Sequence, residues 1–547
     1  MIRLVSKFVL LIYIFLSVSC TNPETVDTSI SDNKEIYKDD NTQEIKEVYV
    51  TVLNPKSSDK KYNYTFSQMN SVSIDNLEYN DAEVKVIFQE GKDGTLKSGY
   101  YGYGQSEYNA TMELRGQSAR LVERKSYKIN LNSKVPWDGY ITVNLNKHPF
   151  DHLLIRNKLA FELIKSVPNL TSARTQLVHM FIKDFSKGDY LNDYVDYGLF
   201  TQIENIDEDY LENHNLDENG NLYKIENFEF RRYEDVLLRK DNPNYDKDAF
   251  EEILEIKGGN THEKLINMLD DVNNDYININ DVIEKHFDRE NFLTWLALNI
   301  LSDNVDTQSR NYFLYSPSTS NIWYFIPWDY DKALGGYEEN RAIWQKGVSN
   351  FWGNIFINRF LMNKNNVKEL SNKVEELHAI LNKQLIKEKI DILKPIAIEY
   401  LSREPDMSIN DNTIDEILLE FDELLNEIEL NYDEYYKSIE RPMPIFLGSP
   451  YLNGNFIEFN WTESFDFQDD PIYYDFEISK DPEFKQIIYK KENLLDNEII
   501  IDKLEPNHYY YRVLIYDIND NKSDAFDIYY DKEKNIYCYG VKDFYVY

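Results

Sequence analysis

The chain has 547 residues, which is enough for several domains that each bury a hydrophobic core. Its 96 acidic and 59 basic residues give a formal net charge of −37, which makes nucleic acids and anionic membrane surfaces unfavourable partners. This charge instead favours basic protein surfaces and metal cations as partners, and it helps to keep the protein soluble.

The first 20 residues have the pattern of an export signal. Arg3 and Lys7 precede an apolar run over residues 8–16, and the small residues from Ser17 onward lead directly to Cys20. The run is too short for a transmembrane helix, which needs about 20 apolar residues. The segment resembles the cleavage box of bacterial lipoproteins, although Ser17 stands where leucine is usual. It predicts an exported protein of the bacterial cell envelope, anchored to the membrane by a lipid at Cys20. The alternative is an ordinary secretory signal.

Residues 21–45 are polar and acidic, with almost no large apolar side chains. This composition predicts a flexible tether that holds the folded part of the protein away from the membrane. If Cys20 is lipidated, Cys538 is the only cysteine left and has no intrachain disulfide partner. We expect Cys538 to be a small buried residue rather than a nucleophile.

The next part of the chain alternates between strand and helix patterns. Alternating apolar residues between 48 and 87 and at 110–114 predict strands of an N-terminal β layer. Apolar residues at helical spacing predict a helix over 150–166. Residues 198–204 have a strand pattern, and residues 291–301 have the pattern of a buried helix. Together these elements predict a mixed α+β domain.

A stretch of acidic and amide residues surrounds two apolar runs. Residues 312–315 and 322–326 flank a polar turn and predict an antiparallel hairpin. With the turn centred near its middle, Asn311 is expected opposite Pro327, and Asp329 then lies roughly 7 Å from Asn311. Isolated carboxylates are costly to bury at the end of an apolar hairpin, and a divalent metal ion would offset that cost.

The spacing of these polar residues matches an arrangement used for phosphoryl transfer. In that chemistry one aspartate accepts the proton of the substrate hydroxyl, whereas an asparagine five residues later and a second aspartate bind metal ions. Here Asp306 is the expected base, and the expected metal ligands are Asn311, Asp329 and Asp331. Asp303 competes for the role of base, but only Asp306 has the five-residue step to Asn311. The alternative is an acid-rich turn in a chain that is acidic throughout.

Several motifs accompany this stretch in a fixed order. They are N-I-L-S-D-N-V-D-T-Q-S-R-N-Y-F-L-Y, I-P-W-D-Y-D-K-A-L-G-G and upstream segments at 113–131, 151–160, 197–204 and 221–224. Together they resemble the CotH kinase family, the spore-coat protein H type of atypical protein kinase, from about residue 46 to 440. The resemblance implies a two-lobed kinase-like fold without a glycine-rich phosphate loop. It also implies ATP and a divalent metal ion (Mg²⁺ or Mn²⁺) as cofactors, and phosphorylation of Ser or Thr in proteins.

Family position also suggests residues that contact the nucleotide. Arg115 and Lys125 are the candidates for the cation that phosphoryl transfer needs near the phosphates. Glu204 lies in the expected linker between the lobes, where adenine usually binds, and Lys224 recurs in the family. For each of these residues the alternative is an ordinary charged residue of the protein surface.

The C-terminal third begins with helix patterns and ends with strand patterns. Apolar stripes predict long amphipathic helices over 367–381 and 417–428, with another around 386–401. The prolines at 441–444 mark a domain boundary. Beyond it, L-E-P-N-H-Y-Y-Y-R-V resembles the late corner and strand of a fibronectin type III module, with Trp461 in its core.

The predicted organisation therefore has five parts. They are a lipoprotein signal (1–20), a tether (21–45), a CotH kinase-like domain (46–350), its helical extension (351–441) and a fibronectin type III-like β-sandwich (442–547). The leading hypothesis is a surface-anchored kinase that phosphorylates Ser or Thr of an envelope or secreted protein, for which a basic surface would suit the acidic enzyme. The main alternative is a non-catalytic lipoprotein with a kinase fold that acts in adhesion or ligand binding. A role as an accessory in carbohydrate degradation rests only on the sandwich.

Overall fold

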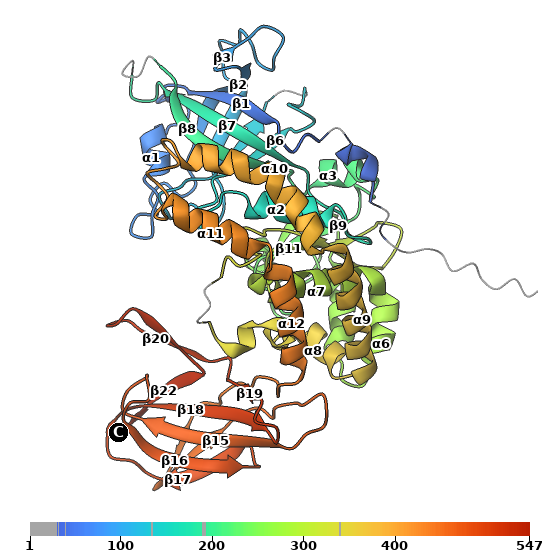
Figure 1. The fold of residues 1–547 in the computed structure, drawn as a ribbon, viewed down its shortest axis with the longest axis vertical. Coiled ribbons are helices and arrows are strands. Elements are labelled where there is room, and N and C mark those ends of the chain that lie inside the picture. The colour runs from blue at the N-terminus through green and yellow to red at the C-terminus, as the bar shows by residue number, and fades with distance from the viewer. Residues whose placement is uncertain (1–29, 31, 39, 133–134, 189–192, 338–340) are drawn as a thin grey trace, which may run out of the picture.

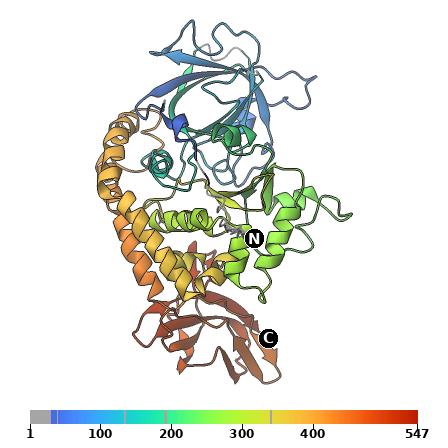
Figure 2. The same cartoon turned by 90° about the vertical axis from the view of Figure 1, so that its right-hand side faces the viewer.

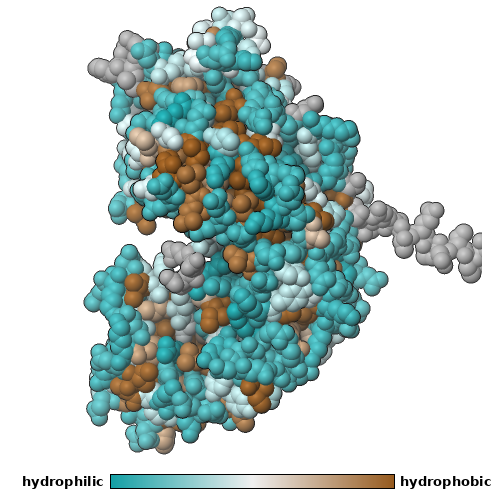
Figure 3. All heavy atoms as spheres, in the orientation of Figure 1, coloured by the Kyte–Doolittle hydropathy of each residue, from teal (hydrophilic) through white to brown (hydrophobic). Residues whose placement is uncertain are grey.

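The computed structural model describes residues 30, 32–38, 40–132, 135–188, 193–337 and 341–547. The predicted signal, Cys20 and residues 21–29, 31 and 39 of the predicted tether lie outside these ranges. Within them, no helix combines the length and the apolar character that a membrane crossing requires. Figure 1 shows a β-rich lobe at the top, a mostly helical lobe below it and a C-terminal β region at the bottom. The face in Figure 3 is mostly hydrophilic, as the acidic composition predicts.

The upper lobe is an eight-stranded sheet with the order β1-β7-β8-β6-β5-β4-β2-β3. Its strands are β1 Ile45–Val52, β2 Glu83–Lys92, β3 Thr95–Leu96, β4 Ala110–Leu114, β5 Tyr127–Leu131, β6 Thr142–Asn146, β7 Thr175–Asp184 and β8 Val195–Ile203. Strand β1 pairs with both β7 and β2, so the sheet closes into a barrel. The short helix α1 (Phe66–Asn70) contributes Phe66 and Met69 to the core of the barrel. The predicted strand at 110–114 is confirmed, and β8 confirms the strand pattern at 198–204.

Helix α2 (Arg156–Ile164) lies between the two lobes and is buried along its whole length. It is shorter than the predicted range of 150–166 because a turn occupies the first residues. The Asp151 carboxylate accepts the N–H groups of Leu153 and Arg156 at 3.0 and 2.8 Å, and Leu154 has a positive φ of 59°. Helical geometry therefore begins only after this turn.

The lower lobe contains a four-stranded antiparallel sheet with the order β10-β9-β11-β12. Its strands are β9 Asn221–Ile225, β10 Leu254–Gly258, β11 Tyr312–Ser316 and β12 Tyr324–Pro327. The predicted hairpin is confirmed, but its predicted register is wrong by one residue, because Tyr312 rather than Asn311 pairs with Pro327. An even number of residues separates the last pair, Tyr315 and Tyr324, so the centre of the turn falls between two residues and not on one.

Ten helices of the described chain surround and follow this sheet. These ten, which do not include α2, are α3 Glu208–Asn213, α4 Lys247–Glu251, α5 Glu263–Val272, α6 Ile279–His286, α7 Arg289–Leu301, α8 Ile355–Leu361, α9 Lys364–Ile380, α10 Lys383–Leu401, α11 Ile414–Leu424 and α12 Glu427–Ile439. The predictions for α7, α9 and α10 are confirmed. The single helix predicted over 417–428 is wrong, because the chain leaves helical geometry at residues 425–426 and restarts as α12. Figure 2 shows the C-terminal helices running along one side of the molecule from the barrel to the C-terminal β region.

The C-terminal β region is a sandwich of two sheets around a common core. The three-stranded sheet contains β13 Tyr451–Asn453, β14 Phe456–Asn460 and β17 Glu498–Asp502. The larger sheet contains β15 Ile472–Ser479, β16 Ile487–Leu494, β18 Asn507–Asp517, β19 Lys522–Ser523 and β22 Val541–Val546, and a separate hairpin joins β20 Ile528–Asp531 to β21 Ile536–Tyr539. Trp461 is buried in the shared core, as predicted, and Cys538 is buried with a free thiol. The Tyr509 hydroxyl donates to the Glu505 carbonyl at 2.9 Å, which is the hydrogen bond of a tyrosine corner.

The sandwich packs directly against the helical lobe. The Trp344 ring, in the 3-10 helix η3 (Ile343–Gln345), lies 5.0 Å from the Phe526 ring of the sandwich. The Asp524 carboxylate accepts the N–H groups of Ile343 and Trp344 at 3.2 and 3.1 Å. Aromatic packing and hydrogen bonds to the backbone therefore hold the sandwich in one orientation on the lower lobe.

Candidate functional site

Two polar residues mark the open end of the hairpin between β11 and β12. Asn311 comes just before β11 and Asp329 comes two residues after β12, and both have positive φ angles, 62° and 58°. Asparagine and aspartate adopt this left-handed conformation more readily than other side chains. The Asn311 N–H donates to the Ile225 carbonyl at 3.3 Å, and the Asn304 amide donates to the Asp329 carbonyl at 3.2 Å. The ladder therefore ends at both positions, and strand alternation no longer dictates where these two side chains point.

The Asp329 carboxylate lies in a charged environment built from several elements. Burial raises its pKa above the ordinary value, and Asp306 and Glu226 raise it further. Arg115 and Lys224 lower this pKa without cancelling the effect of burial. Arg115 follows β4 of the barrel, Lys224 lies on β9, and Asp306 lies in the 3-10 helix η2 (Val305–Gln308). Charges influence one another in this way only at short range, so the fold gathers these predicted site residues at one place.

Asp331 is the second acid of this group. Burial raises its pKa well above the ordinary value, and the carboxylates of Asp329 and Asp151 raise it further. Asp306 adds to this effect, and Lys332 opposes it only partly. Neighbouring buried acids resist simultaneous ionisation unless a cation lies near them. The donor set and its charge therefore fit a divalent cation.

Arg115 reaches from the upper lobe to the lower one. Its guanidinium donates to the side-chain oxygen of Asn146, and its Cζ lies 5.4 Å from the centre of the Trp328 ring. A second contact crosses between the lobes close by, where the Gln117 amide donates to Glu226 at 2.7 Å. Glu226 also forms an ion pair with Lys224. The site is therefore built by both lobes, with cations contributed from each side.

The carboxylates of Asp303 and Asp306 differ in whether they form an ion pair. Arg341 donates to Asp303 at 2.5 Å, and burial raises the pKa of Asp303 to about 6 although Arg341 opposes the rise. Asp306 is as partly buried as Asp303, but no ion pair to its carboxylate occurs within the described ranges. An acid that is already paired with an arginine is poorly placed to accept a proton from a substrate. The geometry therefore favours Asp306 over Asp303 as the base.

Lys125 does not join the acidic group. Its Nζ donates to the carbonyls of Val72 and Arg120, both at 2.6 Å. Burial alone lowers the pKa of Lys125, and no charged group contributes to this change. The side chain lines a separate cavity of about 880 Å³ beside the barrel, with Tyr127 and Lys147. Of the two predicted phosphate-binding cations, the structure therefore places only Arg115 near the acids.

Glu204 also lies apart from the acids. Its Oε2 accepts the backbone N–H of Arg174 at 3.0 Å and is 3.2 Å from a ring nitrogen of His214. His214 in turn contacts Asp32 at 2.8 Å. Burial lowers the pKa of His214, but Asp32 and Glu204 outweigh that effect and raise the pKa overall. Glu204 therefore belongs to a buried network that fastens the end of β8 to the N-terminal segment.

Two residues near the site were not predicted from the sequence. Asp151, whose carboxylate holds the turn before α2, also forms an ion pair with Arg156 at 2.8 Å. His148 is buried, and neither of its ring nitrogens has a hydrogen-bond partner in the described part of the chain. Burial lowers the pKa of His148 to about 4, and nearby Arg115 contributes to the decrease. Asp151 lies within the motif at 151–160 and could have been found there, whereas an isolated histidine carries no such signal.

The acids at the site do not form a closed metal cage. Among the residues that the structure describes, the one group of three acidic, histidine or cysteine ligand atoms within 4.8 Å of one another is Asp466, Asp470 and Asp517, in the sandwich. Mg²⁺ is commonly bound by one or two carboxylates together with phosphate oxygens of the substrate. The arrangement around Asp329 therefore suits a metal ion that arrives with a nucleotide better than a metal ion bound by the protein alone.

Comparisons with known proteins agree with the motifs. The family model described as CotH kinase protein matches residues 112–439. Inner spore coat protein H of Bacillus subtilis (strain 168) is 26% identical over 234 residues, which are 42% of this chain and 60% of that protein. The chain thus covers less than two thirds of this curated relative. A chain from the Shewanella oneidensis MR-1 complex of HipA, HipB and operator DNA matches 54% of this chain and 59% of its own length at 14% identity, with a TM-score of 0.25, which is too low for a comparison of folds.

Proposed function

The chain belongs to the CotH kinase protein family, and from this premise we propose that it transfers the γ-phosphate of ATP to Ser or Thr hydroxyls of a protein. The observation that carries the proposal is the pair of partly buried acids Asp329 and Asp331, set between the lobes beside Arg115 and Lys224. Opposite charges arranged in this way suit a polyphosphate with its metal ion, because the acids bind the metal and the cations bind phosphate oxygens.

In this proposal the acids have two roles, metal binding and proton acceptance. Asp329 and Asp331, with the amide oxygen of Asn311, would hold Mg²⁺ or Mn²⁺, which when bound neutralises charge on the phosphates. Asp306 would accept the proton of the substrate hydroxyl, because its carboxylate has no ion-pair partner among the described residues, whereas Asp303 is paired with Arg341. Positioning and electrostatics, rather than a covalent intermediate on the protein, would account for the rate.

The cations of the site would bind the phosphates from opposite sides. Arg115 presents a planar guanidinium suited to two phosphate oxygens, and its stacking on Trp328 limits its freedom. Lys224 is held by Glu226 and lies on the strand next to β11. Closing the lobes on a nucleotide would bring both cations toward it, because each lobe supplies one of them.

We also propose that the protein acts at the bacterial cell envelope, on a protein substrate with a basic surface. Two observations support this setting: the curated relative is an inner spore coat protein, and residues 1–20 have the pattern of an export signal that ends at Cys20, the predicted lipid attachment site. The net charge of −37 would attract a basic substrate by long-range electrostatics, most strongly at low salt.

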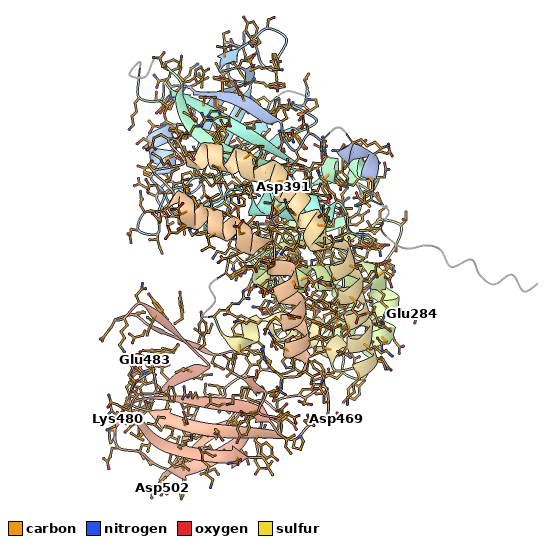
Figure 4. All side chains as sticks on the ribbon, in the orientation of Figure 1. Glu284, Asp391, Asp469, Lys480, Glu483 and Asp502 are labelled. Carbon is orange, nitrogen blue, oxygen red and sulfur yellow. The ribbon has the colours of Figure 1, made fainter. Side chains whose placement is uncertain are left out.

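The test combines phosphate transfer with nucleotide binding. Purified protein is incubated with γ-labelled ATP, Mg²⁺ or Mn²⁺ and a basic protein such as histone, and incorporation of label is followed. We expect Asp306→Ala to lower transfer by at least about 100-fold while it keeps the rise in melting temperature caused by nucleotide and metal. Asp329→Ala should lose both. The control is Asp391→Asn, an exposed position on α10 that Figure 4 labels. Equal, background-level transfer in all four proteins would refute the proposal and leave a non-catalytic binding protein.

A further inference from the structure

Three aspartates of the sandwich form a cluster for which the proposed kinase chemistry has no use. Asp466, Asp470 and Asp517 each offer a carboxylate oxygen, and these oxygens lie within 4.8 Å of one another. Asp466 and Asp517 are only 5% and 2% exposed, and Asp470 is half-buried. Two separate loops bring them together, because Asp466 and Asp470 precede β15 whereas Asp517 ends β18.

Within the part of the chain that the structure describes, no positive side chain balances these charges. None of the three aspartates forms an ion pair with another residue of the described chain. Asp517 accepts the backbone N–H groups of Asn519 and Asn521 at 2.8 and 2.9 Å, and these donors carry no net charge. Burying unpaired carboxylates costs several kcal/mol each in a protein interior. A bound cation is the usual solution to such an arrangement.

One buried oxygen of the cluster has no hydrogen-bond partner among the described residues. Asp466 Oδ1 accepts the N–H groups of Gln468 and Asp470 at 2.8 and 2.9 Å. Asp466 Oδ2 is inaccessible to solvent and has no hydrogen-bond partner among the described residues. Burial raises the pKa of Asp466, and Asp470 and Asp517 raise it further. Native proteins rarely leave a buried carboxylate oxygen without a partner, so this atom points to a ligand that completes its environment.

We propose that Asp466, Asp470 and Asp517 bind a hard divalent cation, and that Ca²⁺ fits the site best. Oxygen ligands without nitrogen or sulfur select hard cations. Opposite ligands of Ca²⁺ are about 4.6–5.2 Å apart, whereas those of Mg²⁺ are about 4.0–4.2 Å apart and must be close to octahedral. Ca²⁺ therefore tolerates the full spread of up to 4.8 Å between these oxygens.

The cation would stiffen the joint between the sandwich and the helical lobe. The Phe465 ring, next to Asp466, stacks on Trp352 of the lower lobe with ring centres 5.5 Å apart. The Phe467 ring lies 6.2 Å from the same tryptophan, and the Gln468 amide donates to the carbonyl of Ile439, the last residue of α12, at 3.1 Å. In Figure 4, Asp469 of the same loop is labelled at the end of the sandwich nearest the helices. The cation would tie this loop to the turn after β18.

The test measures Ca²⁺ binding without nucleotide, by calorimetric titration and by the rise in melting temperature of the purified chain. The site variant is Asp470→Asn, because this half-buried residue can change with the least effect on folding. The matched control is Asp469→Asn, an exposed acid of the same loop that pairs with Lys364 instead. Asp329→Asn separates this site from the proposed kinase site.

We expect wild type, Asp469→Asn and Asp329→Asn to bind Ca²⁺ and to melt at a higher temperature in its presence. Asp470→Asn should bind at least about tenfold more weakly, because even outer-shell partners contribute about 10–100-fold to metal affinity. Proteolysis at residues 441–450 should slow with Ca²⁺ in wild type but not in Asp470→Asn. Absence of Ca²⁺ binding in wild type, or unchanged affinity in folded Asp470→Asn, would overturn the proposal.

Discussion

Glu427, the first residue of α12, is the site of the most quantitative prediction. Its carboxyl group packs so closely against Gly335 that a Cβ on this glycine would lie 2.7 Å from the carboxyl carbon. Gly335 follows the segment that carries Asp329 and Asp331, so Glu427 packs against the chain just after these two acids. Burial raises the pKa of Glu427 to about 7, and the Asp303 carboxylate adds to the increase.

The size and sign of the effect follow from this pKa. The difference between 4.5 in the unfolded chain and about 7 in the folded protein corresponds to about 3 kcal/mol, at about 1.4 kcal/mol per pH unit. Because Glu427 is partly exposed, screening by solvent makes this value an upper limit. The folded protein holds the proton more tightly than the unfolded chain, so the free energy of unfolding falls as pH rises from about 4.5 to about 7.

Glu427→Gln removes the charge and keeps the shape of the side chain. We expect this variant to be more stable than wild type by up to about 3 kcal/mol at pH 8.5 and nearly equal to it at pH 4.5. The assay is urea unfolding at both pH values, followed by the fluorescence of the buried tryptophans. Glu388→Gln, at an exposed position of α10, is the control and should show no pH-dependent difference. An equal change for Glu427→Gln at both pH values would refute the assignment of a buried charge.

Three further predictions test the site, the support of the barrel and the sandwich. Arg115→Met should abolish the rise in melting temperature caused by ATP and Mg²⁺, whereas Lys125→Met should keep it, since only Arg115 lies near the acids; equal effects would contradict this placement. Asp406→Asn leaves buried Lys147, 2.5 Å away, without its partner and should lower the free energy of unfolding by about 3–5 kcal/mol in urea. The double variant Lys147→Met/Asp406→Leu should recover most of that loss, and a single variant as stable as wild type would argue against a buried pair. Tyr509→Phe should lower the stability of the sandwich transition in calorimetry by about 1 kcal/mol, and no change would show that the corner hydrogen bond adds nothing.

The local sequence pattern predicted two buried elements correctly. The alternation at 110–114 predicted β4 (Ala110–Leu114), and the apolar run at 291–301 predicted most of α7 (Arg289–Leu301). The alternation at 110–114 follows the two-residue period of a strand, whereas α7 is buried on every face over residues 291–301 and was recognised from the length of its apolar run. The apolar stripe at 417–428 failed as a single helix because a stripe continues across a short break when two successive helices bury their faces in the same core.

The register of the hairpin is a feature that the local sequence did not predict. Its two strands were evident from apolar runs, but a difference of half a residue in the centre of the turn changed every cross-strand pair. Lys264, from α5, donates to the carbonyls of Pro317 and Ser320 and so helps to set this turn. A residue some 50 positions earlier in the chain thus contributes to the register, which no local pattern contains.

The sequence by itself determined which residues were available for chemistry: the acids at 306, 329 and 331, Asn311, and several cations at family positions. It also indicated the boundary before the sandwich, from the prolines at 441–444 and the strand patterns beyond them, whereas the two lobes were implied by the resemblance to the CotH kinase family. Only the tertiary structure decided that Arg115 joins the acids while Lys125 and Glu204 serve other networks. It also brought together the sandwich aspartates from two distant loops. The physical reason is that charge interactions and metal coordination depend on distances in space, which closure of the barrel and packing of the lobes set.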